Sequence, residues 1–339
     1  MTGYPAGHVC LPHRSHFIRH APCPKTEPPM IRIYAGPNGS MAQVKDIADG
    51  CWIRVIDPIA AEIAYLQQTL NLPANFIADA LDPHERSRYD KENDSILVVL
   101  RVPVYEGEDV PVQYTTVPLG IILTQSHVTT VCSRDSAILQ PIADGKVKNI
   151  CVAEKDKFLI QVAFQTARQY LKFLELINMR TNEIEEELHE SLKNEELVKL
   201  LNLEKSLVFF TTSLKANEAV LERMQRGEVV KLSPKEAALL DDALIETRQA
   251  IDMANIYSNI LGGLMDAFAS IISNNLNIVM KFLTAVTIIL MAPNLLASIY
   301  GMNVDLPFQH DPLVFIFILV MSVWMSIVIA FLFLKRRMF

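Results

Sequence analysis

The sequence lacks the motifs by which common enzyme classes are recognised. Between residues 30 and 155 it has no glycine-rich phosphate loop, no G-x-S-x-G nucleophile elbow and no H-E-x-x-H metal pair. Its five cysteines form no C-x-x-C pair, which suits a reducing compartment without a disulfide framework. Since no catalytic constellation is found, we expect that the protein is not an enzyme.

Positive charge is also in short supply. The chain has 31 Lys and Arg residues against 38 Asp and Glu residues, a formal net charge of −7. This balance argues against a nucleic-acid partner and is compatible with a surface that handles cations. A charged-then-apolar segment followed by a small-residue cleavage site is missing at the N-terminus, so secretion is not indicated.

The first residues, 1–29, are rich in proline and histidine and show no regular hydrophobic pattern. We expect a disordered tail there. A metal site is the alternative, but the irregular spacing of its candidate ligands matches no compact zinc pattern. These ligands are His8, Cys10, His13, His16, His20 and Cys23.

Charge is missing altogether from two long apolar runs in the last sixth of the chain, Phe282–Tyr300 and Leu313–Leu334. About 20 apolar residues are needed to cross roughly 30 Å of hydrocarbon, and both runs meet that length. A buried hairpin in a soluble domain is the alternative, but soluble helices seldom stay free of charge for so long. We therefore predict two transmembrane helices, over 277–300 and 313–334.

The flanks of these helices predict their orientation. Lys281 precedes the first apolar run, and the predicted basic tail 335–339 follows the second, whereas the connecting segment 301–312 contains no Lys or Arg. Because basic residues near membrane ends tend to remain in the cytoplasm, we expect both termini inside and 301–312 as an external loop. The protein would then be a multi-pass protein of the cytoplasmic (inner) membrane.

Ahead of the membrane, the pattern changes once. Residues 30–155 alternate short strand-like and helical runs, which predicts a cytoplasmic α/β domain. From 156 to 276 the pattern is helical, which predicts a cytoplasmic helical stalk. Its last helix begins with a capping box, Ser233 with Glu236, and meets no further proline until Pro293. Such a helix, about 100 Å long, needs neighbours along most of its length.

A cluster of acidic residues marks the turn near Ser191, between the first two stalk helices. Two interpretations stay open: a solvated helix face, or a layer that concentrates cations. The cluster consists of Glu183, Glu185, Glu186, Glu187 and Glu190.

The polar residues of the first apolar run fall on one helical stripe. Two sets of residues spaced seven apart form the a and d positions of a heptad seam: Asn277, Thr284, Met291 and Ser298, and Met280, Thr287, Asn294 and Gly301. Polar groups at bilayer depth must face protein or water, so this seam should face the interior of an assembly. It would either pack helices together or surround a water-filled path.

The first helix ends in Tyr300-Gly301-Met302-Asn303, which resembles the Y-G-M-N signature of the CorA family of magnesium transporters. The segments Asn277–Lys281 and Met291–Pro293 and the basic C-terminal end agree with this family. The resemblance covers the chain from about Met30 onward. It implies an α+β membrane protein with a CorA-like homopentamer in the lipid bilayer, in which the first span lines a central pore and the second forms an outer ring.

The resemblance also implies roles for residues. Gly301, Met302 and Asn303 would form the selectivity filter, whose oxygen acceptors hold hydrated Mg²⁺. Asn294 stands where the family often has threonine, and Leu283, together with Met280 and Met291, would narrow the inner pore. Asp79 and Asp242 match regulatory Mg²⁺ positions, and Asp266 would form an acidic ring.

The function that follows is passive Mg²⁺ uptake, gated by intracellular Mg²⁺. One alternative is a transporter of another divalent metal, zinc, cobalt or nickel, on the same architecture, with Co²⁺ or Ni²⁺ as alternative substrates. Another is a membrane-anchored helical scaffold without transport activity. The scaffold predicts that the polar seam serves packing alone.

Overall fold

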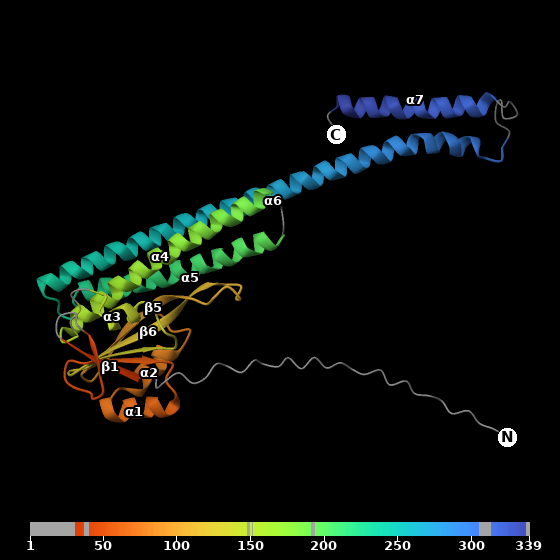
Figure 1. Ribbon diagram of the computed structural model, residues 1–339. Helices are drawn as coiled ribbons and strands as arrows, with labels where there is room; N and C mark the ends of the chain where they lie inside the picture. The colour runs from red at the N-terminus through yellow and green to blue at the C-terminus, as the bar shows by residue number, and fades with distance from the viewer. Residues whose placement is uncertain are drawn as a thin grey trace, which may run out of the picture.

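The computed structural model describes residues 31–36, 41–147, 150, 152–190, 194–304 and 313–336 (Figure 1). The predicted tail 1–29 with its histidines, most of the predicted external loop and the last residues of the basic tail lie outside this description. What is described forms a sheet domain, a bundle of three long helices and a C-terminal hairpin of apolar helices.

The sheet has seven strands in the order β2-β1-β3-β7-β6-β5-β4. Every neighbouring pair is antiparallel except β3 and β7, which are parallel. The strands are β1 (Ile31–Ala35), β2 (Ala42–Val44), β3 (Trp52–Ile56), β4 (Arg88–Glu92), β5 (Ser95–Tyr105), β6 (Tyr114–Leu123) and β7 (Val128–Cys132).

Helices cover both faces of this sheet. On one face lie α1 (Ala60–Leu70) and α2 (Ala74–Leu81), and on the other lie α3 (Leu139–Ala143) and the long helices (Figure 1). The central strands are therefore buried on both sides. This explains why every residue of β3 and β7 is buried, without the alternation of buried and exposed residues seen in a sheet with one solvated face.

One glycine sets how closely α2 approaches the sheet. A Cβ added to Gly120 in β6 would lie 2.4 Å from the Cβ of Ala80, so only glycine fits beneath this helix. Asp79, the residue before Ala80 in α2, is partly buried.

The stalk consists of α4 (Lys155–Glu190), α5 (Asn194–Gln225) and α6 (Pro234–Tyr300). The predicted capping box is confirmed: Glu236 Oε2 accepts from Ser233 N at 2.7 Å, and Ser233 Oγ accepts from Glu236 N at 3.4 Å. An apolar cluster that includes Tyr170, Phe173 and Phe210 joins the three helices. The expectation that the last helix is long and bundled is confirmed, because α6 has 67 residues and packs against α4 and α5.

Polar contacts tie the stalk to the sheet. Asn217 of α5 bonds both backbone groups of Arg101 in β5, at 2.9 Å to its N–H and 2.8 Å to its carbonyl. Tyr170 of α4 donates to the same carbonyl at 3.0 Å. Arg101 Nε in turn donates to Thr116 Oγ1 at 3.0 Å, and burial lowers the pKa of Arg101. Sheet and stalk therefore act as one folded unit.

The C-terminal part of α6 extends beyond α4 and α5, and α7 (Leu313–Lys335) lies beside it (Figure 1). Among the described residues, α6 and α7 are the two helices long and apolar enough to cross a membrane. Both contain the predicted apolar runs.

Candidate functional site

The predicted seam lies on the surface of the single chain. Each of its predicted pore-lining residues is exposed. They are Asn277, Met280, Leu283, Thr284, Thr287, Met291, Asn294 and Ser298.

Helix α7 packs on the opposite face of α6. The residues of α6 that are covered there begin with the fully buried Ala285 and continue through Ile289 and Leu296 to Tyr300. At about 100° per residue, this face lies roughly half a turn away from Thr284 and Thr287. An assembly that met at the seam would therefore have α6 at its centre and α7 on its outside.

The hydroxyl groups of the two seam threonines donate hydrogen bonds within α6. Thr284 Oγ1 donates to Met280 O at 2.7 Å, and Thr287 Oγ1 donates to Leu283 O at 2.7 Å. Because a hydroxyl oxygen has two acceptor lone pairs, each threonine still presents an acceptor on the exposed side of the helix. This arrangement suits contact with a cation or with its water shell.

The signature residues form the end of α6. Gly301 N donates to Ala297 O at 2.9 Å, and Met302 N donates to Ile299 O at 3.3 Å. Gly301 has a φ of −84°, which other residues adopt as well, but a Cβ there would lie 3.2 Å from the Ala297 carbonyl oxygen. The glycine is thus favoured by this tight contact. Met302 and Asn303 follow it on the exposed surface.

Asn294 of the seam also lines a cavity between the two apolar helices. A cavity of about 610 Å³ lies between α6 and α7, and Asn294 lines it together with Pro293, Ser322 and Ser326. The residue that was predicted only for the pore thus stands at the border between the seam and this cavity.

Asp79 is paired within its own domain. Arg88 of β4 donates to Asp79 Oδ2 at 2.7 Å, to Glu85 at 2.8 Å and to Asp90 at 3.1 Å. The bond with Glu85 is the main cause that raises the pKa of Arg88. Sequence reasoning missed Arg88. Glu85 lies in the loop after α2 and Arg88 begins β4, so no helical spacing indicates their pair, and the contact with Asp79 depends on how α2 packs.

The other predicted regulatory residues, Asp242 and Asp266, are exposed on α6. In the part of the chain that the structure describes, no group of three or more His, Cys, Asp or Glu side chains could hold a metal ion. A metal site at these aspartates would therefore need ligands from a second copy or from water.

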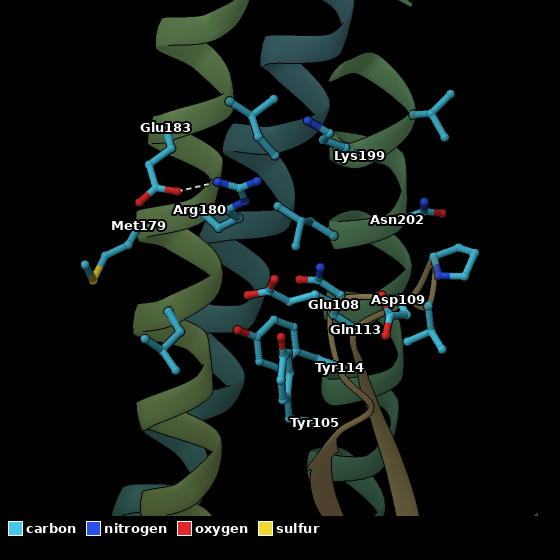
Figure 2. Close-up of a pocket in the computed structure, with 16 residues that line it drawn as sticks. Tyr105, Glu108, Asp109, Gln113, Tyr114, Met179, Arg180, Glu183, Lys199 and Asn202 are labelled. Carbon is cyan, nitrogen blue, oxygen red and sulfur yellow. Dashed lines mark hydrogen bonds and ion pairs between the residues drawn. The ribbon is translucent and has the colours of Figure 1, made fainter. Parts of the chain in front are cut away.

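The acidic cluster near the end of α4 is partly neutralised. It borders a cavity of about 900 Å³ between the β5–β6 turn and helices α4 and α5 (Figure 2). There Arg180 bonds Glu183 at 2.6 Å, and Lys199 contacts Glu187 at 3.7 Å and Glu196 at 2.7 Å. These ion pairs favour the solvated-face interpretation for the part of the cluster that they reach.

Comparisons with known proteins agree on the whole arrangement. Residues 48–337 match the family described as CorA-like Mg²⁺ transporter protein. The Cobalt/magnesium transport protein CorA of Methanocaldococcus jannaschii is 30% identical over 291 residues, which cover 84% of this chain and 90% of that protein. The protein of the same description from Thermotoga maritima is 25% identical over 232 residues, 68% of this chain and 66% of that protein.

A solved structure is similar over nearly the full length. The complete structure of the CorA magnesium transporter from Methanocaldococcus jannaschii has a TM-score of 0.77 and 25% sequence identity, and the match covers 91% of this chain and 98% of that one. The sheet domain, the stalk and the apolar hairpin thus occur together in a known protein.

Proposed function

The chain belongs to the family of CorA-like Mg²⁺ transporter proteins, and we propose that it forms a homopentameric channel for passive uptake of Mg²⁺. The members of this family transport divalent cations and are not enzymes, which confirms that expectation from the sequence. The membrane would be the cytoplasmic (inner) membrane, with both chain termini in the cytoplasm.

The observation that carries the proposal is the position of the polar seam. Its asparagine, threonine and serine side chains are exposed on the face of α6 that α7 leaves uncovered, with Asn294 at the border of that face. At bilayer depth, contact of these groups with hydrocarbon would be costly, so other copies or water must cover them. Several copies of α6 that meet at the seam satisfy this requirement and enclose a polar path.

The filter would consist of Asn303 amide oxygens and the backbone carbonyls of Gly301 and Met302. Mg²⁺ loses its water reluctantly, so neutral acceptors that hold the hydrated ion suit a selective entrance. Farther in, the threonine hydroxyls would offer acceptors, and Met280, Leu283 and Met291 would form an apolar constriction that closes by losing its water.

The driving force would be electrical. A divalent cation gains about 4.6 kcal/mol for every 100 mV of inside-negative potential, twice the value for one charge. This energy suffices to concentrate Mg²⁺ without nucleotide hydrolysis.

The decisive experiment measures Mg²⁺ uptake into liposomes that contain the full chain. Uptake should rise with inside-negative potential. Asn303→Ala should reduce it by at least about tenfold, the loss typical of one well-placed polar contact. Asn275→Ala is the matched control, because Asn275 is an exposed asparagine of the same helix that lies off the seam. Full uptake by Asn303→Ala, with assembly intact, would contradict the filter role of Asn303. An assembled wild type that takes up no Mg²⁺ would instead favour the scaffold.

Cobalt is the second candidate substrate. Both relatives are named as cobalt/magnesium transport proteins. Parallel uptake of Mg²⁺, Co²⁺, Ni²⁺ and Zn²⁺ in the same liposomes decides the order of preference. A protein that carries Zn²⁺ but not Mg²⁺ would be a transporter of another metal on this architecture.

Gating by intracellular Mg²⁺ belongs to the same proposal. Bound ions would hold neighbouring copies together by cancelling the repulsion between Asp79 and Asp242, with Asp266 as a ring closer to the membrane. At Asp79 the ion would have to compete with Arg88.

Asp79→Asn combined with Asp242→Asn should weaken the inhibition of flux by internal Mg²⁺. Asp241→Asn is the control, because the Asp241 carboxylate already accepts from Gln225 at 2.6 Å. Unchanged inhibition in the double variant would remove these aspartates from the gating proposal.

A further inference from the structure

Helix α6 has an open position in its hydrogen-bond ladder at bilayer depth. Pro293 lies inside the helix and has no N–H group, so it cannot donate to the carbonyl of Ile289 four residues earlier. In hydrocarbon, no bulk water is at hand to replace such a donor. The Ile289 carbonyl therefore needs a partner from elsewhere in the protein.

A serine of the neighbouring helix takes that place. Ser326 Oγ of α7 donates to Ile289 O at 3.3 Å. Ser322, one turn earlier on α7, behaves differently, because its hydroxyl donates to Ile318 O within its own helix at 2.8 Å. Both serines line the cavity between the two helices, and Pro293 lines it too.

We propose that Ser326 is a positioning residue for ion selection: its hydroxyl replaces the N–H missing at Pro293 and so holds the outer end of the pore helix in place. The inference rests on the proposed function. The end in question carries Asn294, Ser298 and the signature Gly301–Asn303, all of which lie beyond the open position.

The direction of the effect follows from where the helix is weakest. A helix bends most easily where its ladder is interrupted, and the interruption lies on the face that α7 covers. Loss of the Ser326 hydroxyl leaves the Ile289 carbonyl to find another donor, and bending at Pro293 is the movement that brings one near. Such a bend displaces Asn303 relative to its counterparts in the other copies.

The test is a double-mutant cycle in the full chain. Ser326→Ala, Pro293→Ala and the double variant are compared with the wild type by reversible unfolding in mixed micelles and by the ratio of Co²⁺ to Mg²⁺ uptake in liposomes. Ser326→Ala should shift the unfolding equilibrium constant by about threefold to tenfold, the range of interhelical hydrogen bonds in membranes. It should also change the uptake ratio.

In the Pro293→Ala background, residue 293 regains its N–H and can donate to Ile289. The effect of Ser326→Ala should then fall within about twofold, the limit for sites that do not interact. Ser326→Thr keeps the hydroxyl and should retain both wild-type values. Ser322→Ala, which removes a hydroxyl from the same cavity without breaking an interhelical bond, should leave the uptake ratio unchanged.

Equal effects of Ser326→Ala in both backgrounds would overturn the inference, as would a Ser322→Ala variant with the same uptake ratio as Ser326→Ala. The proposed function is tested separately, because the unfolding arm needs no transport. Coupling in unfolding without any uptake by the wild type would contradict the channel and the positioning role together, whereas normal uptake without coupling would contradict the positioning role alone.

Discussion

The sheet domain and the membrane hairpin differ in how far the single chain buries their side chains and satisfies their polar groups. Where the domain meets the stalk, Asn217 and Tyr170 each bond the backbone of Arg101 within one chain, and Trp52 is wholly enclosed in the domain. In the hairpin, Ala285 is the one buried residue of α6 beyond Phe268, and α7 has none among the described residues. The domain is therefore complete as a single chain, whereas the hairpin depends on its surroundings.

Lipid explains only part of that dependence. The exposed leucine, isoleucine and phenylalanine side chains of α7 and of the outer faces of α6 are matched by hydrocarbon. Hydrocarbon does not match the exposed asparagine and threonine side chains, because their polar groups need hydrogen-bond partners. The comparison thus separates residues that a bilayer satisfies from residues that only further copies or water satisfy.

The largest effect is expected from a charge placed on the seam. Thr287→Lys would surround the path with positive charge, so measurable Mg²⁺ uptake by liposomes should be lost. Asn275→Lys, off the seam on the same helix, should keep uptake. Size measurements in detergent establish that both variants assemble. Uptake by an assembled Thr287→Lys variant would contradict the view that the hairpin needs other copies around an ion path.

A substitution in the core of the sheet domain should instead lower the stability of the fold. Trp52 stacks on Tyr34 at 5.0 Å between ring centroids, contacts Phe158 and donates to Thr130 Oγ1 at 2.9 Å. Trp52→Ala should lower the free energy of unfolding by about 3–5 kcal/mol, because it leaves a large cavity. Denaturant unfolding measures the loss. Tyr65→Ala, at an exposed position of α1, should cost far less.

Alkaline pH should weaken the domain through a buried thiol. Burial raises the pKa of Cys132 from 9.0 to about 11. The folded protein holds this proton to higher pH than the unfolded chain does. The resulting stability is therefore fully present below pH 9 and is lost as pH rises toward about 11.

The size of this loss is about 2–3 kcal/mol for a shift of this magnitude. Unfolding experiments across the same pH range test it in the wild type and in Cys132→Ala. The variant should show a shallower fall. An identical pH dependence in both proteins would show that other groups cause the loss.

The smallest effect on stability is expected at the Arg101 carbonyl, because two side chains donate hydrogen bonds to it. Tyr170→Phe removes a hydroxyl that donates to Arg101 O, but Asn217 Nδ2 still donates to the same carbonyl at 2.8 Å. We expect a loss of about 1 kcal/mol in the free energy of unfolding, typical of one hydrogen bond whose partner stays satisfied. A loss of several kcal/mol would mean that the sheet and the stalk depend on this bond far more than their packing indicates.

The sequence predicted best where the cause was local. Ser233 and Glu236 lie three residues apart and cap α6 as expected. Two strands carry little local signal: β2 has only three residues, and β4 lies at the edge of the sheet with polar side chains. Strand β6 also begins at Tyr114, ahead of its most apolar stretch, because pairing with β5 extends it.

By itself, the sequence determined the two apolar helices, the long stalk helix and the single polar seam, because length, charge and helical spacing are properties of neighbouring residues. Only the tertiary structure decided that α7 covers the face opposite the seam, that Arg88 pairs with Asp79, and that Ser326 reaches the carbonyl opposite Pro293. Each of these contacts joins segments that no local pattern relates, since the distance between them is set by packing.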